Sequence, residues 1–219
     1  MYVPAHFVET DLVRLDWLAA HDSFGTLISS VDGAPFATHM PVLYARDGER
    51  VTLTGHWARP NPQWRTLEGQ RALFIFHGPH AYISPRWYVE PARNVPTWNY
   101  AVAHVYGDVR LINERDALER IVTALAARYE TDSPDAWRLA DSDPANRAML
   151  KGIVGFELAA DDVQLKFKLN QNHPPANVEG AIRGLRAIGS EDAEHTAILM
   201  ERAVERRRGS KTESPPREP

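Results

Sequence analysis

The chain has 219 residues, of which 43% are hydrophobic and 25% are charged, an ordinary composition for one sizeable globular domain that excludes wholesale disorder. No apolar run approaches the ~20 residues that a spanning helix requires, which excludes a helical membrane protein. The net charge is −4, so DNA could be bound only through a local basic patch. Cysteine is absent, which excludes disulfides and thiolate metal sites and favours a cytoplasmic location.

The first third of the chain predicts one short helix followed by antiparallel hairpins. Thr10 and Asp11 can cap a helix that ends near residue 22. Asp-Gly pairs at 32–33 and 47–48 then separate apolar runs, as in tight hairpin turns. Asn61-Pro62 offers a cap for a second short helix. The expected strands are Phe24–Ser30, Phe36–Tyr44, Arg50–Thr54 and Ala72–Phe76.

The rest of the chain predicts one long central strand, two shorter ones and several helices. Residues 96–111 alternate with apolar side chains on both faces, as in a central strand. Asn113 can cap a helix that carries Leu118, Ile121 and Leu125. Further on, we expect strands over Ile153–Leu158 and Val163–Leu169 and helices over Val178–Ala187 and 190–208.

Six to seven antiparallel strands with helices inserted and appended indicate an α+β fold with an antiparallel barrel, because strand–helix alternation is missing. We expect one domain over residues 1–190, a C-terminal helix over 191–208 and a disordered tail over 209–219, where proline and charge are concentrated.

The segment Thr54–Trp64 collects features that suit an anion. Gly55 permits close approach of the backbone, a helix start offers free N–H groups, and Arg59 supplies a forked cation for phosphate oxygens. The alternative is that Arg59 pairs with an acidic neighbour and that His56 is a core or surface histidine.

His77 and His80 lie three residues apart in what reads as a glycine-proline turn beside aromatic residues. This spacing does not favour a metal, since the helical histidine pair is missing and no carboxylate is placed nearby. Haem is a further alternative for histidines beside aromatics. Nucleophile elbows and glycine-rich phosphate loops are absent, so the sequence assigns no catalytic residue and no metal.

Several segments in succession resemble the PaiB-like family, whose members are described as FMN-binding negative transcriptional regulators. The resemblance covers about residues 1–190. The segments that carry it are Pro35–Pro41, Gly55–Trp64, Phe76–Pro85, Val95–Tyr100 and Lys168–Asn172.

This resemblance implies an FMN-binding split barrel that assembles as a homodimer with flavin at the interface. It implies that one strand segment lines the isoalloxazine and that a second segment holds the phosphate. It also implies that two aromatic residues close the ring pocket from the partner subunit, with a lysine and a glutamine as weaker candidates. These residues are, in the same order, Thr38, His39, Met40 and Pro41; Thr54, Gly55, His56 and Arg59; Trp98 and Tyr100; and Lys168 and Gln171.

Three classes of function follow from these patterns. A flavin-dependent oxidoreductase would use FMN for hydride transfer, with His39, His56 or Tyr100 as proton donors. A binding protein would hold FMN or haem without turnover. A DNA-reading repressor is not favoured, because the basic run 206–208 ends a helix rich in acidic residues and no helix-turn-helix is found.

Overall fold

The computed structural model describes residues 1–130, 134–139 and 143–212. The chain folds into two compact units, which we describe separately. We call Asp11–His77 with Ala103–Gln164 the barrel unit. We call Met1–Thr10, Gly78–Val102 and the chain from Leu165 onward the helix-pair unit.

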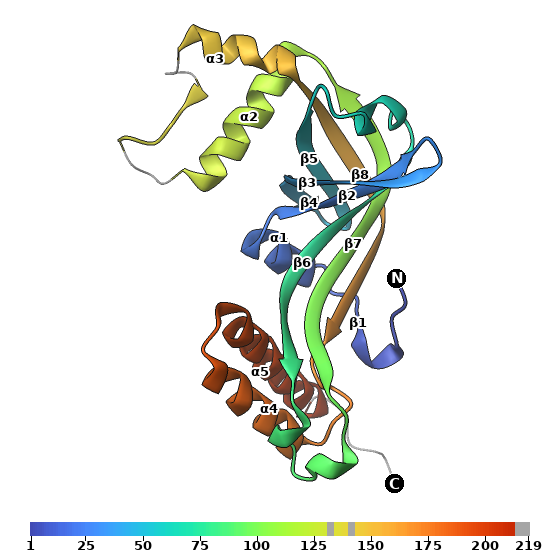
Figure 1. Cartoon of the computed structure of the whole chain (residues 1–219), viewed down its shortest axis with the longest axis vertical. Coiled ribbons are helices and arrows are strands. Elements are labelled where there is room, and N and C mark those ends of the chain that lie inside the picture. Colours follow the sequence, from blue (N-terminus) through green and yellow to red (C-terminus); the bar gives the residue numbers. More distant parts are fainter. Residues whose placement is uncertain (131–133, 140–142, 213–219) are drawn as a thin grey trace. The chain divides into compact units, whose positions relative to one another are not determined.

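Eight strands form one sheet in the order β3-β2-β6-β7-β8-β5-β4, with β1 pairing with β8 (Figure 1). The pairs β2–β3, β2–β6, β4–β5, β5–β8 and β1–β8 are all antiparallel. The strands are β1 (Val8–Glu9), β2 (Phe24–Val31), β3 (Ala34–Pro41), β4 (Leu43–Asp47), β5 (Arg50–Ala58), β6 (Arg71–Ile83), β7 (Thr97–Ile112) and β8 (Ile153–Lys168).

Local sequence explains how the barrel unit begins. The Asp11 carboxylate accepts a hydrogen bond from Val13 N at 3.0 Å, at the start of α1 (Val13–His21). Asp32 and Gly33 both have positive φ, 51° and 79°, as a two-residue hairpin turn requires. Alternate residues of β6, including Phe74 and Phe76, are fully buried, so one face of the sheet forms the core.

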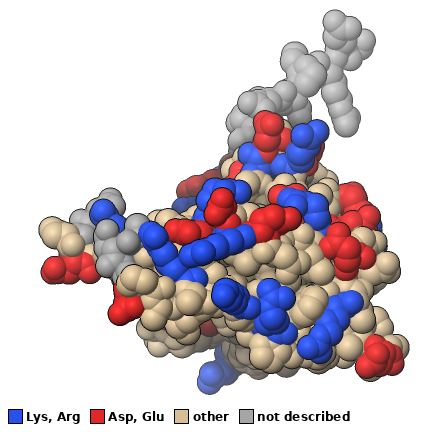
Figure 2. Space-filling model, turned by 90° about the horizontal axis from the view of Figure 1, so that it is seen from above, with Lys and Arg blue, Asp and Glu red and all other residues tan. Residues whose placement is uncertain are grey.

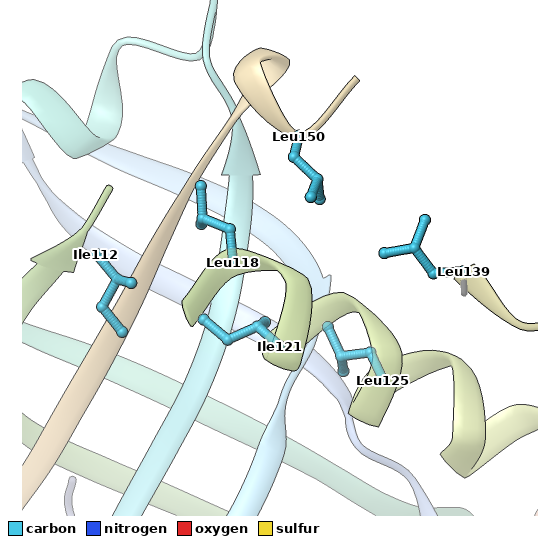
Figure 3. Close-up of a cluster of buried hydrophobic side chains, with 6 residues drawn as sticks. All are labelled: Ile112, Leu118, Ile121, Leu125, Leu139 and Leu150. Atoms are coloured by element: carbon cyan, nitrogen blue, oxygen red, sulfur yellow. The ribbon is translucent and has the colours of Figure 1, made fainter. Parts of the chain in front are cut away.

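An apolar cluster lies between the sheet and the inserted helices of the barrel unit (Figure 3). Helix α2 (Arg115–Tyr129) supplies its central residues, and α3 (Pro144–Ala148) leads into the turn η6 (Met149–Gly152). Gly155 lies on β8, which packs against α2, and a Cβ at Gly155 would lie 2.9 Å from Leu118 Cδ2. The cluster comprises Ile112, Leu118, Ile121, Leu125, Leu139 and Leu150.

The helix-pair unit is built on α4 (Pro175–Ile188) and α5 (Glu191–Thr212), which lie side by side (Figure 1). Trp87 at the end of the turn η3 (Pro85–Trp87) packs against α4 at two glycines. A Cβ at Gly180 would lie 2.0 Å from the Trp87 carbonyl oxygen, and one at Gly184 would lie 2.2 Å from its ring. The remaining short turns are η1 (Ala5–Phe7), η2 (Gln63–Thr66) and η4 (Pro91–Arg93).

Four expectations from the sequence are corrected by the structure. The single strand expected over Phe36–Tyr44 is two strands, β3 and β4, which lie at opposite ends of the sheet order. The expected glycine-proline turn at residues 77–80 is wrong, because β6 continues through it. The neighbouring strand β2 pairs with β6 only at Leu73–Ile75. The missing backbone N–H of Pro79 therefore breaks no hydrogen bond to β2. The two short strands expected over 153–169 are one strand, β8. Helix α2 begins after Glu114 without a side-chain cap from Asn113.

The final helix extends to Thr212, beyond its expected end at residue 208, and residues 213–219 of the expected disordered tail lie outside the described residues. Within the described chain, the helices are too short or too polar to cross a bilayer.

Candidate functional site

The segment Thr38–Pro41 places its side chains on two faces of β3, because residues of a strand alternate. Met40 is buried in the core, and the Thr38 hydroxyl donates a hydrogen bond to Gln63 Oε1 at 2.6 Å. His39 is exposed and pairs across the ladder with Thr26 of β2. The four predicted residues therefore do not share one surface.

His39 belongs to a polar group that we call the histidine face: Thr26, His39, His77 and His104. The Thr26 hydroxyl lies 3.0 Å from His39 Nδ1 and 3.2 Å from His77 Nε2, so one hydroxyl joins two imidazoles. His104 follows on β7, the next strand of the sheet. The centres of the His104 and Tyr106 rings are 6.2 Å apart. Burial first, and His77 as a lesser cause, hold the pKa of His104 below its ordinary value.

Strand β5 carries Thr54, Gly55 and His56 at its centre. Gly55 faces the core, where a Cβ would lie 2.8 Å from the Phe156 ring, so glycine is required here by packing. Thr54 and His56 point to the opposite side of the strand. Burial lowers the pKa of His56, whose Nδ1 atom has no hydrogen-bond partner in the described part of the protein.

The guanidinium of Arg59 joins the end of β5 to the start of β8. Its Nε donates to the Lys151 carbonyl and its Nη2 to the Ile153 carbonyl, both at 2.7 Å. The group also lies 5.9 Å from the centre of the Trp64 ring. Neither partner is a carboxylate, so the positive charge of Arg59 is not neutralised by these contacts.

Gln63, which the sequence analysis did not single out, holds three strands together from the turn η2. Its Oε1 accepts from Trp57 Nε1 at 3.1 Å, in addition to Thr38. Its Nε2 donates to the carbonyls of Leu27 at 3.1 Å and Phe36 at 3.2 Å. Gln63 is fully buried, and a lone glutamine in a polar turn has no periodicity that would identify it.

In the helix-pair unit, Trp98 and Tyr100 share a face of β7, as the alternation predicts. Trp98 is 52% exposed, a large value for tryptophan. The centres of the Trp98 and Tyr82 rings are 6.1 Å apart. Lys166 Nζ lies 5.2 Å from the centre of the Tyr100 ring. This unit therefore presents an exposed aromatic surface beside a cation.

The two weaker candidates hold the end of β8 in place. Lys168 Nζ donates to the Trp98 carbonyl at 2.9 Å and to the Thr97 hydroxyl. Desolvation first, and Lys166 second, lower the pKa of Lys168. Gln171 Oε1 accepts from Leu169 N at 2.7 Å, so this side chain stabilises the turn after the strand.

Comparison with known proteins places the chain in a family. Residues 1–162 match the family described as "Putative FMN-binding domain". The chain belongs to this FMN-binding domain family. It is also 37% identical to "Protease synthase and sporulation protein PAI 2" of Bacillus subtilis (strain 168), over 92% of this chain and 97% of that protein. The predicted PaiB-like family and its flavin cofactor class are confirmed.

Solved structures share the fold at low sequence identity. The FAD and heme binding protein from Mycobacterium smegmatis is 22% identical with a TM-score of 0.53, over 73% of this chain and 72% of that one. The flavocytochrome Anf3 from Azotobacter vinelandii is 16% identical with a TM-score of 0.57, over 76% and 72%. The expected α+β split barrel is confirmed, and its sheet is open between β3 and β4 in the described chain.

The residues on the histidine face fit a flavin chemically. Hydroxyl and imidazole groups can donate to or accept from the polar edge of an isoalloxazine, and Ile28, Leu73 and Ile75 lie on the same face as partly exposed apolar residues. Thr26, His77 and His104 were not among the predicted site residues. Only the strand register and the hydrogen bonds of the Thr26 hydroxyl bring Thr26 and His77 beside His39.

The buried histidines predict how stability depends on pH. His56 and His104 have lowered pKa values in the folded protein, whereas both protonate near the ordinary pKa of about 6.5 when unfolded. The free energy of unfolding should therefore be fully retained above about pH 6.5 and should fall as the pH drops toward the folded pKa values. Urea denaturation at about pH 7.5 and pH 5.5 measures this difference.

His56→Gln combined with His104→Gln should reduce the difference between the two pH values. His6→Gln, at an exposed histidine, serves as the matched control and should leave the difference unchanged. An undiminished difference in the double variant would contradict the assignment.

Proposed function

We propose that this chain binds FMN on the histidine face of its barrel unit. The observation that carries this proposal is the Thr26 hydroxyl, which orients His39 and His77 on the side of the sheet opposite the core. These donors would hold the polar edge of the isoalloxazine, and Arg59 would hold the phosphate as a forked cation. The family match supports the choice of FMN.

The visible spectrum of the purified protein, with and without added FMN, tests this function. Flavin bands that remain with the protein through gel filtration are the expected result. Thr26→Val keeps the shape of the side chain but removes the hydroxyl, and should weaken FMN binding by about 0.5–1.5 kcal/mol. Thr52→Val on β5 is the matched control. A colourless protein that takes up no FMN would contradict the proposal.

We also propose that the flavin site is completed in a homodimer. Strand β7 has partly exposed apolar residues on the face opposite the core, and exposed Trp98 suits an interface anchor. The ring would be closed by Trp98 and Tyr100 of the partner subunit. Light scattering at micromolar concentration should report about twice 24.7 kDa. A monomer that still binds FMN would contradict the interfacial site.

If the protein is an enzyme, we propose that it is a flavin-dependent oxidoreductase. Bound FMN would supply hydride transfer. Of the candidate proton donors, His39 is exposed and oriented by a hydroxyl, whereas His56 is partly buried. His39 is therefore the better placed of the two histidines to exchange a proton with a substrate.

Haem is the second candidate ligand, favoured by exposed His39 and His77, since an accessible imidazole can ligate iron. Among the described residues, there is no group of three histidine, aspartate or glutamate side chains placed to hold a metal ion. A Soret band in the purified protein, in place of flavin bands, would favour haem.

The name of the Bacillus subtilis relative links that protein to protease synthesis and sporulation. For this chain we propose a location in the cytoplasm. We also propose that any effect on gene expression is indirect. Arg206, in the basic run that would have to contact DNA, forms an ion pair with Glu9 at 3.0 Å. Sequence-specific DNA binding is therefore not part of the proposal.

A further inference from the structure

A cavity of about 350 Å³ lies in the barrel unit beside the end of β5, the start of α2 and the segment α3–η6. This volume is in the range of small-molecule sites. Four of its lining side chains are cationic, and two leucines of the apolar cluster shown in Figure 3 also line it. These residues are Arg59, Arg115, Arg147, Lys151, Leu118 and Leu150.

Among the described residues that line the cavity there is no carboxylate. Arg59 donates to main-chain carbonyls, and Arg147 lies 3.7 Å from Glu119. Within the described ranges, Arg115 and Lys151 have no ion pair. Figure 2, seen from above the view of Figure 1, shows Lys and Arg side chains gathered on this face with acidic ones among them.

Four carboxylates adjoin the lining residues in sequence: Glu119 pairs with Arg147, Asp116 is exposed in the first turn of α2, and Glu114 and Asp143 accept hydrogen bonds from the backbone. Glu114 accepts from the backbone N–H of Asn113 at 3.2 Å, and Asp143 accepts from Ala145 N at 2.7 Å. Helix α2 begins at the cavity without a side-chain cap, which leaves its first N–H groups for another acceptor. The cations, the uncapped helix start and a described lining without acid all favour an anionic ligand.

The apolar side of the cavity restricts the ligand further. Leu118 and Leu150 are buried members of the apolar cluster, so the cavity ends on an apolar surface. A bare inorganic anion would leave that surface uncovered, whereas a ligand with both an anionic group and an apolar part would contact both sides.

Of the residues expected to bind flavin, only Arg59 lines this cavity. We propose that the cavity is a second ligand site, which lies apart from the histidine face and shares only Arg59 with the proposed flavin site, and that it binds a small organic phosphate with an apolar part. The proposal would stand even if the protein bound haem in place of FMN, since none of the histidine face lines the cavity.

Phenyl phosphate, inorganic phosphate and phenol are suitable probes, measured by calorimetry on the full-length protein with and without FMN. Phenyl phosphate should bind more tightly than inorganic phosphate, and phenol should not bind. Arg115→Ala combined with Lys151→Ala should weaken phenyl phosphate binding by about tenfold or more, because two charge-assisted contacts are lost. Arg120→Ala, at an exposed arginine of α2 outside the cavity, should have no effect.

The affinity for FMN distinguishes this site from the flavin site. The double variant should bind FMN as the wild type does. If FMN binding falls in the double variant while riboflavin binding is unchanged, the cavity holds the flavin phosphate and the second site does not exist. Phenyl phosphate binding that is absent, or equal in the double variant and the wild type, would also overturn the proposal.

Discussion

Replacing Arg59 with alanine is expected to weaken FMN binding by about 1.5–3 kcal/mol, the usual contribution of a hydrogen bond to a charged group. Riboflavin lacks the phosphate, so its affinity should change little. Titration of both flavins into wild type and variant measures the two losses. An equal loss for riboflavin would show that Arg59 does not contact the phosphate.

The structure adds a second effect of the same substitution. Arg59→Ala also removes the hydrogen bonds to the carbonyls of Lys151 and Ile153, so the free energy of unfolding should fall by about 1–3 kcal/mol. Arg65→Ala is a matched control, because Arg65 lies over the same Trp64 ring at 5.5 Å. It should preserve FMN affinity, which separates the phosphate contact from packing on the tryptophan.

Replacing Gln63 with methionine is expected to produce the largest loss of stability, about 3 kcal/mol or more, because the amide satisfies several buried groups at once. Methionine nearly preserves the volume of the side chain, so the loss reports hydrogen bonding and not a cavity. The variant would leave Trp57 Nε1 and the Leu27 carbonyl without their partner. Urea denaturation of the full-length protein measures the loss.

Gln70→Met provides the control, since Gln70 is exposed and close in sequence. Its effect should stay within about 0.5 kcal/mol, as is usual for surface substitutions. Equal stability of Gln63→Met and wild type would show that water replaces the glutamine amide, and the assigned role in joining β2, β3 and β5 would be wrong.

Local patterns in the sequence predicted most of the strands and turns correctly. Strand β2 follows from an apolar run before an Asp-Gly pair, and the long strand β7 follows from alternation. The hairpin after β2 follows from Asp32-Gly33, because its backbone needs positive φ at both residues. These features depend on residues close together in the chain, so their signal is local. The segments resembling the PaiB-like family added the split barrel and the flavin class.

Long-range pairing decided what local patterns could not. Pro79 predicts a turn when read alone, but β6 continues through it. The missing N–H of Pro79 breaks no bond to β2, because β2 pairs only with Leu73–Ile75. Thr38 and His39 are neighbours in sequence, yet one points to Gln63 in the core and the other to Thr26 on the histidine face.

The sequence by itself therefore determined the fold class and the family, and its segments for the flavin site remain a prediction. Only the tertiary structure decided which of those side chains meet. The histidine face combines residues of β2, β3, β6 and β7, and the cationic cavity combines residues from the end of β5, α2 and α3–η6. The physical reason is that a hydrogen bond or a cavity depends on distances in space, which strand register and helix packing set among residues far apart in the chain.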